Sequence, residues 1–136
     1  MPSKSQVSVE YMIIMGFATL MTLPLLLIYY TYSSDAADSV ASNQALQIAR
    51  KIVDSSESVY YLGKPSQTTL KLNFPDSIKS INLSSREVVL KIKVKQGIGE
   101  VVQVANVNMS GSLPTSAGLH VITLTAQDGY VQISSN

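Results

Sequence analysis

The feature that most constrains this chain is an apolar run of 22 residues without a charge, residues 11–32. A helix that rises 1.5 Å per residue would span about 33 Å over this run, which is enough to cross the hydrocarbon core of a bilayer. Tyr29, Tyr30 and Tyr32 lie at its far end, where aromatic residues often mark a membrane interface. A secretory signal peptide would have a shorter apolar region followed by a small-residue cleavage site, and neither feature is present. The run therefore predicts a transmembrane helix.

The charges on either side of this run indicate its orientation. Lys4 precedes the apolar residues, whereas Asp35 and Asp38 follow them. Positive charge tends to stay on the cytoplasmic side of a membrane helix. We therefore expect a single-pass protein in the cell membrane, with a cytoplasmic N-terminus and the remainder of the chain outside.

A polar segment lies directly before the apolar run. Residues 4–11 read Lys-Ser-Gln-Val-Ser-Val-Glu-Tyr, which places Glu10 at the entrance to the hydrocarbon. A carboxylate at such a depth is costly and usually marks a functional site. The alternative is that Glu10 lies among the lipid headgroups and interacts with the positive end of the helix dipole.

This segment resembles the class III signal peptide of archaeal type IV pilin-like proteins, in which a Q-x-S-x-E-Y pattern is followed at once by an apolar run. The resemblance implies that a prepilin peptidase cuts the precursor between Ser5 and Gln6, where Ser5 occupies a position often held by glycine in the family. Residues 1–5 would be the leader, and residues 6–33 would be retained as a transmembrane and filament-core helix.

The resemblance also implies a function. The chain would be a structural subunit of an archaeal pilus-like surface filament used for adhesion, and it would self-associate through its apolar helix. Its partners would be the peptidase, the pilus assembly machinery and, before assembly, membrane lipid. Gln6 and Glu10 would take part in assembly, as a pair between the new amino terminus and the carboxylate. The alternative is a minor pilin-like or membrane-anchored surface binding protein that does not form the bulk of a filament.

Beyond the apolar run, residues 34–62 carry a second helical pattern. Small and apolar residues recur at steps of three and four, as in an amphipathic helix; they are Val40, Ala41, Ala45, Ile48, Ala49, Ile52, Val53, Val59 and Tyr60. No Pro or Gly interrupts this stretch, so the two helices are predicted to form one rod of roughly 84 Å. Pro24 is expected to kink the apolar half. Gly63 and Pro65 are expected to end the helix.

Residues 66–136 change to a period of two, which is typical of strands. Apolar residues alternate with polar ones around positions 70–74, 81–83 and 90–94, and further strands are expected at 100–107, 119–126 and 130–133. Turns are expected at 84–86, at 96–99 and through Asp128 and Gly129, with a loop at 108–118. The predicted fold is α+β: a long helix followed by a small, extracellular, antiparallel β sheet or sandwich.

The remaining sequence favours a structural protein over an enzyme. The chain has no cysteine, one histidine and a net charge of +1. No nucleophile–base pair, metal-ligand cluster or phosphate loop is present, so we expect no catalysis and no cofactor. A balanced charge is also unlike that of nucleic-acid-binding proteins, so no nucleic acid is expected. His120 is expected to pack or hydrogen-bond within a strand.

Two surface features complete the pattern. Lys91, Lys93 and Lys95 alternate along one predicted strand and are expected to be a solvated face, although they could also attract an acidic surface or glycan. Asn82 and Asn108 begin two N-glycosylation sequons. We expect Asn108 to be the more accessible, because it opens the predicted loop.

Overall fold

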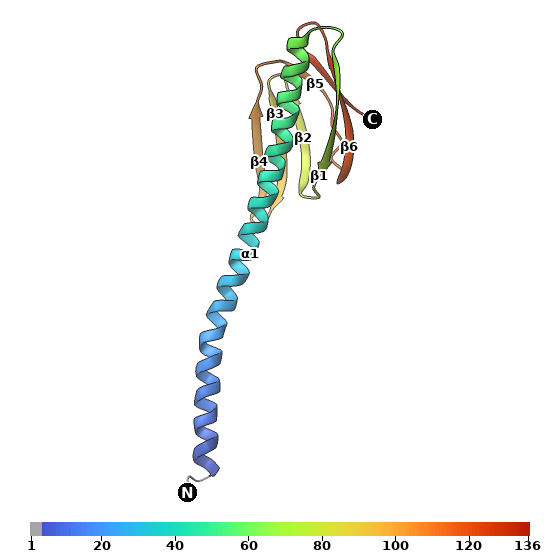
Figure 1. Cartoon of the computed structure of the whole chain (residues 1–136). Coiled ribbons are helices and arrows are strands. Elements are labelled where there is room, and N and C mark those ends of the chain that lie inside the picture. Colours follow the sequence, from blue (N-terminus) through green and yellow to red (C-terminus); the bar gives the residue numbers. More distant parts are fainter. Residues whose placement is uncertain (1–3) are drawn as a thin grey trace. The chain divides into compact units, whose positions relative to one another are not determined.

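The computed structural model describes residues 4–136, and it contains one long helix followed by seven strands (Figure 1). Helix α1 spans Lys4–Leu62. The strands are β1 (Gln67–Phe74), β2 (Ile78–Ser84), β3 (Glu87–Val94), β4 (Gly97–Val104), β5 (Met109–Gly111), β6 (Gly118–Ala126) and β7 (Val131–Ser135). The α+β prediction is therefore confirmed. The first three residues of the expected leader lie outside the described residues.

The chain divides into two compact units, and the boundary falls inside α1. One unit ends at Ala37 and contains the apolar part of the helix, while the other is Asp38–Asn136. The second part of α1 thus belongs to the same compact unit as the strands. Its amphipathic pattern explains this, because an apolar stripe must be buried against another element.

Helix α1 is helical throughout, including at Pro24, and it ends where the sequence predicts. Gly63 has a φ of +78°, and its N–H donates to the carbonyl of Tyr60 at 3.1 Å. A left-handed residue cannot continue a right-handed helix, and glycine adopts that conformation at low cost. Pro65 follows within two residues. The helix therefore ends for a local reason, before the first strand begins.

The strands form two sheets. One has the order β1-β6-β7-β5 and the other has the order β2-β3-β4. All pairs are antiparallel except β5 and β7, which are parallel with Met109 opposite Val131. The expectation that all strands pair antiparallel is thus wrong for β5 and β7. The reason is that Met109, in a Ser- and Gly-rich stretch that predicted a loop, is buried and pairs through its backbone.

The turn expected at residues 96–99 is also displaced. Val94 pairs with Gly97, so the connection is the two-residue turn Lys95-Gln96, and Gly97 and Gly99 lie inside β4. Gly99 pairs with Ile92 of β3, and a Cβ built on it would lie 3.4 Å from the Ile92 side chain, an ordinary van der Waals distance. Gly99 is therefore a strand residue and not part of the turn. The hairpin through Asp128 and Gly129 is present, with Ala126 opposite Val131.

A single core joins the second half of α1 to both sheets. The helix contributes a buried stripe, and the sheets contribute inward-facing residues. The buried apolar residues are Ala45, Ile48, Ala49, Ile52, Val53, Val59, Leu72, Phe74, Ile78, Val88, Leu90, Ile92, Ala105, Val107, Met109, Leu113, Ile122, Leu124, Ala126, Val131 and Ile133. The predicted stripe is largely confirmed, although Val40 is 55% exposed. Ser56, which the pattern did not select, is fully buried because its hydroxyl donates to the carbonyl of Ile52 at 2.7 Å.

Candidate assembly surface

The first part of α1 is an apolar helix whose large apolar side chains stay exposed in the part of the chain that the structure describes. Each large apolar side chain in this part is between about half and three quarters exposed. They are Val7, Val9, Tyr11, Met12, Ile13, Ile14, Met15, Phe17, Leu20, Met21, Leu23, Leu25, Leu26, Leu27, Ile28, Tyr29, Tyr30 and Tyr32. Soluble monomers rarely expose a continuous surface of this kind, which instead indicates a membrane or protein interface. Among the described residues, α1 is a helix long and apolar enough to span a membrane.

Three threonine hydroxyls on this helix are satisfied within it. The hydroxyls of Thr19, Thr22 and Thr31 donate to the carbonyls of the residues four positions earlier, at 2.8, 2.7 and 3.0 Å. A hydroxyl that is bonded back to its own helix costs little when it enters lipid or an apolar interface. These threonines are therefore compatible with either surrounding.

A shallow groove lies along one side of the same helix. It is lined by Met15, Gly16, Thr19, Leu20, Leu23, Pro24 and Leu27. Gly16 has no side chain, and a Cβ built there would meet nothing within 4 Å. Pro24 has no N–H, so the carbonyl of Leu20 has no donor at the usual helical position. The kink expected at Pro24 stays a prediction, because helical geometry continues through this residue.

The predicted processing and assembly residues lie in the first turns of α1. Ser5, Gln6 and Glu10 are all helical and exposed. Gln6 and Glu10 are four positions apart, so they lie on one side of the helix within reach of each other. Neither side chain has a hydrogen bond or ion pair within the described residues. Both side chains are therefore available to a partner from outside the described residues.

The two sequon asparagines lie in different surroundings, and both are exposed. Asn82 is in β2, opposite Val89 of β3. Asn108 directly precedes β5; its carbonyl accepts from the N–H of Val131 at 2.8 Å, and its side-chain amide is 3.4 Å from the carbonyl of Gly129. The long open loop expected around Asn108 is thus shorter than predicted, while both residues stay accessible.

The lysine triplet is exposed, as expected, but it does not belong to an edge strand. Lys91 and Lys93 are on β3, the central strand of its sheet, and Lys91 is 3.6 Å from Glu100 of β4. Lys95 follows in the turn, where its backbone N–H donates to Asp38. Lys91 and Lys93 therefore make the outer face of the three-stranded sheet charged and exposed to water.

His120 is hydrogen-bonded within its own segment, as expected. Its Nε2 is 2.8 Å from the carbonyl of Ser116, and its ring lies 5.0 Å from that of Phe74. The described residues contain no group of three His, Cys, Asp or Glu side chains that could hold a metal ion. Comparisons of the chain with protein families, curated proteins and solved structures found no match.

Proposed function

We propose that this chain is a structural subunit of an archaeal type IV pilus-like surface filament. The observation that carries the proposal is that a segment resembling a processing motif is followed directly by an apolar helix whose large side chains are exposed. Residues 4–11 resemble a class III signal peptide, and the apolar run that follows, residues 11–32, contributes no large apolar side chain to the core of the described residues. A helix of this kind needs either lipid or other helices around it.

In the proposed mechanism, the apolar helix moves from the lipid bilayer into a bundle of identical helices. Before assembly the helix is held in the membrane, with the strand-bearing unit outside the cell. Cleavage before Gln6 removes Lys4 and frees a new amino terminus. The helices of successive subunits then leave the lipid and pack together, and the burial of their apolar side chains away from water maintains the fibre.

Gln6 and Glu10 have a defined role in this mechanism. The amino group created at Gln6 is mostly protonated at neutral pH, since an α-amino group has a reference pKa of about 8. It can pair with Glu10 of its own chain or of the next subunit. A lone charge among apolar helices is costly, whereas a pair is tolerated and sets the axial register of neighbouring subunits.

The cleavage step gives the proposal a direct test. We expect the mature protein, purified from archaeal membranes that contain a prepilin peptidase, to begin at Gln6. Intact-mass and N-terminal peptide measurements would show this, and Gln6→Ala together with Ser5→Pro should leave the leader attached. A mature protein that begins at Met1 in cells with an active peptidase would contradict the proposal.

A further inference from the structure

The outer face of the three-stranded sheet carries exposed valines. Strands β2, β3 and β4 are neighbours in this sheet, and Val88, Leu90 and Ile92 of β3 belong to the core (Figure 1). Side chains alternate along a strand, so the residues between these three point outward. On the outward side of β4, Val102 and Val104 are 48% and 60% exposed. Outward positions on a sheet with one buried face are usually polar, so adjacent valines there indicate a surface that another group covers.

Asn82 lies in one row with two of the outward-facing valines. It is opposite Val89 of β3, and Val89 is in turn opposite Val102 of β4. Neighbouring strands are about 4.8 Å apart, so Val102 lies about 10 Å from Asn82 across the face of the sheet. Asn82 is exposed, and its side chain makes no hydrogen bond within the described residues. A free amide thus stands at the end of an apolar row.

This amide also begins an N-glycosylation sequon, Asn82-Leu83-Ser84. Sequons arise by chance, so the three residues alone carry little, and the surroundings decide. Asn82 and Ser84 are both exposed on the outer face, while Leu83 between them is half-buried. A sugar attached to Asn82 therefore leaves the sheet without displacing a core residue. Asn108, the sequon residue expected to be more accessible, directly precedes β5 instead of opening a long loop.

We propose that Asn82 is N-glycosylated and that its first sugar packs over Val89 and Val102. The C–H groups of a sugar ring suit an apolar row, while its hydroxyl groups stay in water. The inference rests on one part of the proposed function, the extracellular position of the strand-bearing unit.

The modification is a group transfer from a lipid-linked sugar phosphate, catalysed by a membrane glycosyltransferase. The amide nitrogen of Asn82 forms a bond to the anomeric carbon of the sugar. The bond from that carbon to the phosphate oxygen breaks, and the lipid phosphate leaves with the electron pair. A base of the transferase takes the amide proton.

The sequence makes a direct test possible, because trypsin separates the two sequons. Cleavage after Lys and Arg releases residues 80–86 with Asn82 and leaves Asn108 in residues 96–136. The full chain would be purified from an archaeal host whose own surface proteins are N-glycosylated, and its peptides analysed by mass spectrometry. We expect most copies of the 80–86 peptide to carry an added sugar mass, which fragmentation places on Asn82.

Two substitutions of Ser84 separate the sequon from the asparagine. Ser84→Ala keeps Asn82 but should abolish the added mass, whereas Ser84→Thr retains a hydroxyl and should keep it. In Ser84→Ala the valines lose their cover, so the midpoint of thermal unfolding should fall by about 3 °C. In a Val102→Thr background this difference should shrink. The matched control is Ser110→Ala, which removes the other sequon and should leave the 80–86 peptide modified.

The outcomes distinguish this inference from the proposed function. An unmodified 80–86 peptide overturns the inference, and a chain that nevertheless begins at Gln6 leaves the proposed function standing. A modified peptide in a chain that begins at Met1 supports the inference and contradicts the proposed function. Equal unfolding midpoints for a modified native chain and for Ser84→Ala would show that the sugar does not pack on the valines, which also overturns the proposal.

Discussion

Replacing Glu10 with alanine should leave the chain in the membrane and reduce its yield in surface filaments by about tenfold or more. The apolar run, residues 11–32, is unchanged in Glu10→Ala, so we expect insertion of the helix into the membrane to be unaffected. In the proposed filament, however, the ammonium created at Gln6 would lose its partner inside the packed helices. Removing one member of a buried ion pair costs about 3–5 kcal/mol, and each 1.4 kcal/mol is a factor of ten in an equilibrium.

The matched control for this substitution is Asp35→Ala. Asp35 is an exposed carboxylate on the same helix, beyond the other end of the apolar run. Membrane-fraction protein and sheared filaments would be measured separately for each variant. Asp35→Ala should give a near-normal filament yield. A normal yield from Glu10→Ala would refute the pairing role, and equal losses from both variants would show that the effect is not specific to the amino terminus.

Replacing Gly111 with alanine should destabilise the strand-bearing unit strongly. Gly111 is the last residue of β5 and has a φ of +141°, and an added Cβ would lie 1.9 Å from the carbonyl oxygen of Ile133. That oxygen belongs to the neighbouring strand β7, so it cannot move without disturbing the parallel pair. Backbone strain costs about 1–3 kcal/mol and overpacking a similar amount, so we expect a loss of about 4 kcal/mol in the free energy of unfolding.

Gly118→Ala provides the comparison. Gly118 has a φ of +122°, which is nearly as unfavourable for alanine, but a Cβ there would meet nothing within 4 Å. It should cost only the backbone strain, about 1–3 kcal/mol. Thermal unfolding of the full chain in detergent, followed by the near-ultraviolet signal of its tyrosines, would measure both. Similar stabilities for the two variants would contradict the contact with Ile133.

The elements of this fold could be predicted from local patterns, because each pattern has one simple cause. A long uncharged run needs an apolar environment, which identified the helix through residues 11–32. The three- and four-residue spacing identified the stripe from Ala45 to Val59, and period-two alternation identified most strands. Gly63 ended the helix for a reason that is visible in the sequence.

The arrangement of the strands could not be predicted in this way. Alternation shows that a segment has one buried face, but not which strand lies beside it. The parallel pairing of β5 with β7 brings together residues more than twenty positions apart. A single apolar residue, Met109, in a Ser- and Gly-rich stretch does not indicate a strand or its partner. Ser56 was missed because a hydroxyl that bonds to its own helix can be buried, although its residue type is usually exposed.

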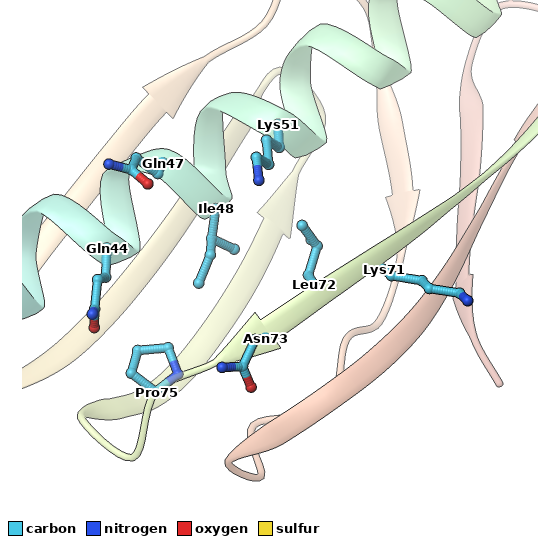
Figure 2. A pocket seen from close by; sticks show the side chains of 8 residues that line it. All are labelled: Gln44, Gln47, Ile48, Lys51, Lys71, Leu72, Asn73 and Pro75. Atoms are coloured by element: carbon cyan, nitrogen blue, oxygen red, sulfur yellow. The ribbon is translucent and has the colours of Figure 1, made fainter.

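The same distinction, between residues close in sequence and residues brought together by folding, applies to the functional residues. Ser5, Gln6 and Glu10 are close in sequence, so the motif was visible before the structure. The contact between α1 and β1 was not, since positions 44–51 and 71–75 meet only when the helix packs against the sheet (Figure 2).

The central claim is that the apolar helix forms the core of a filament, and a helical reconstruction tests it most directly. Filaments sheared from cells that produce this chain would be imaged by electron cryomicroscopy. We predict a core of packed helices whose density begins at Gln6 and continues through about residue 33, with Glu10 against an amino terminus and the strand-bearing unit outside. Filaments whose core is built from a different chain, while this one stays uncut in the membrane fraction, would contradict the account.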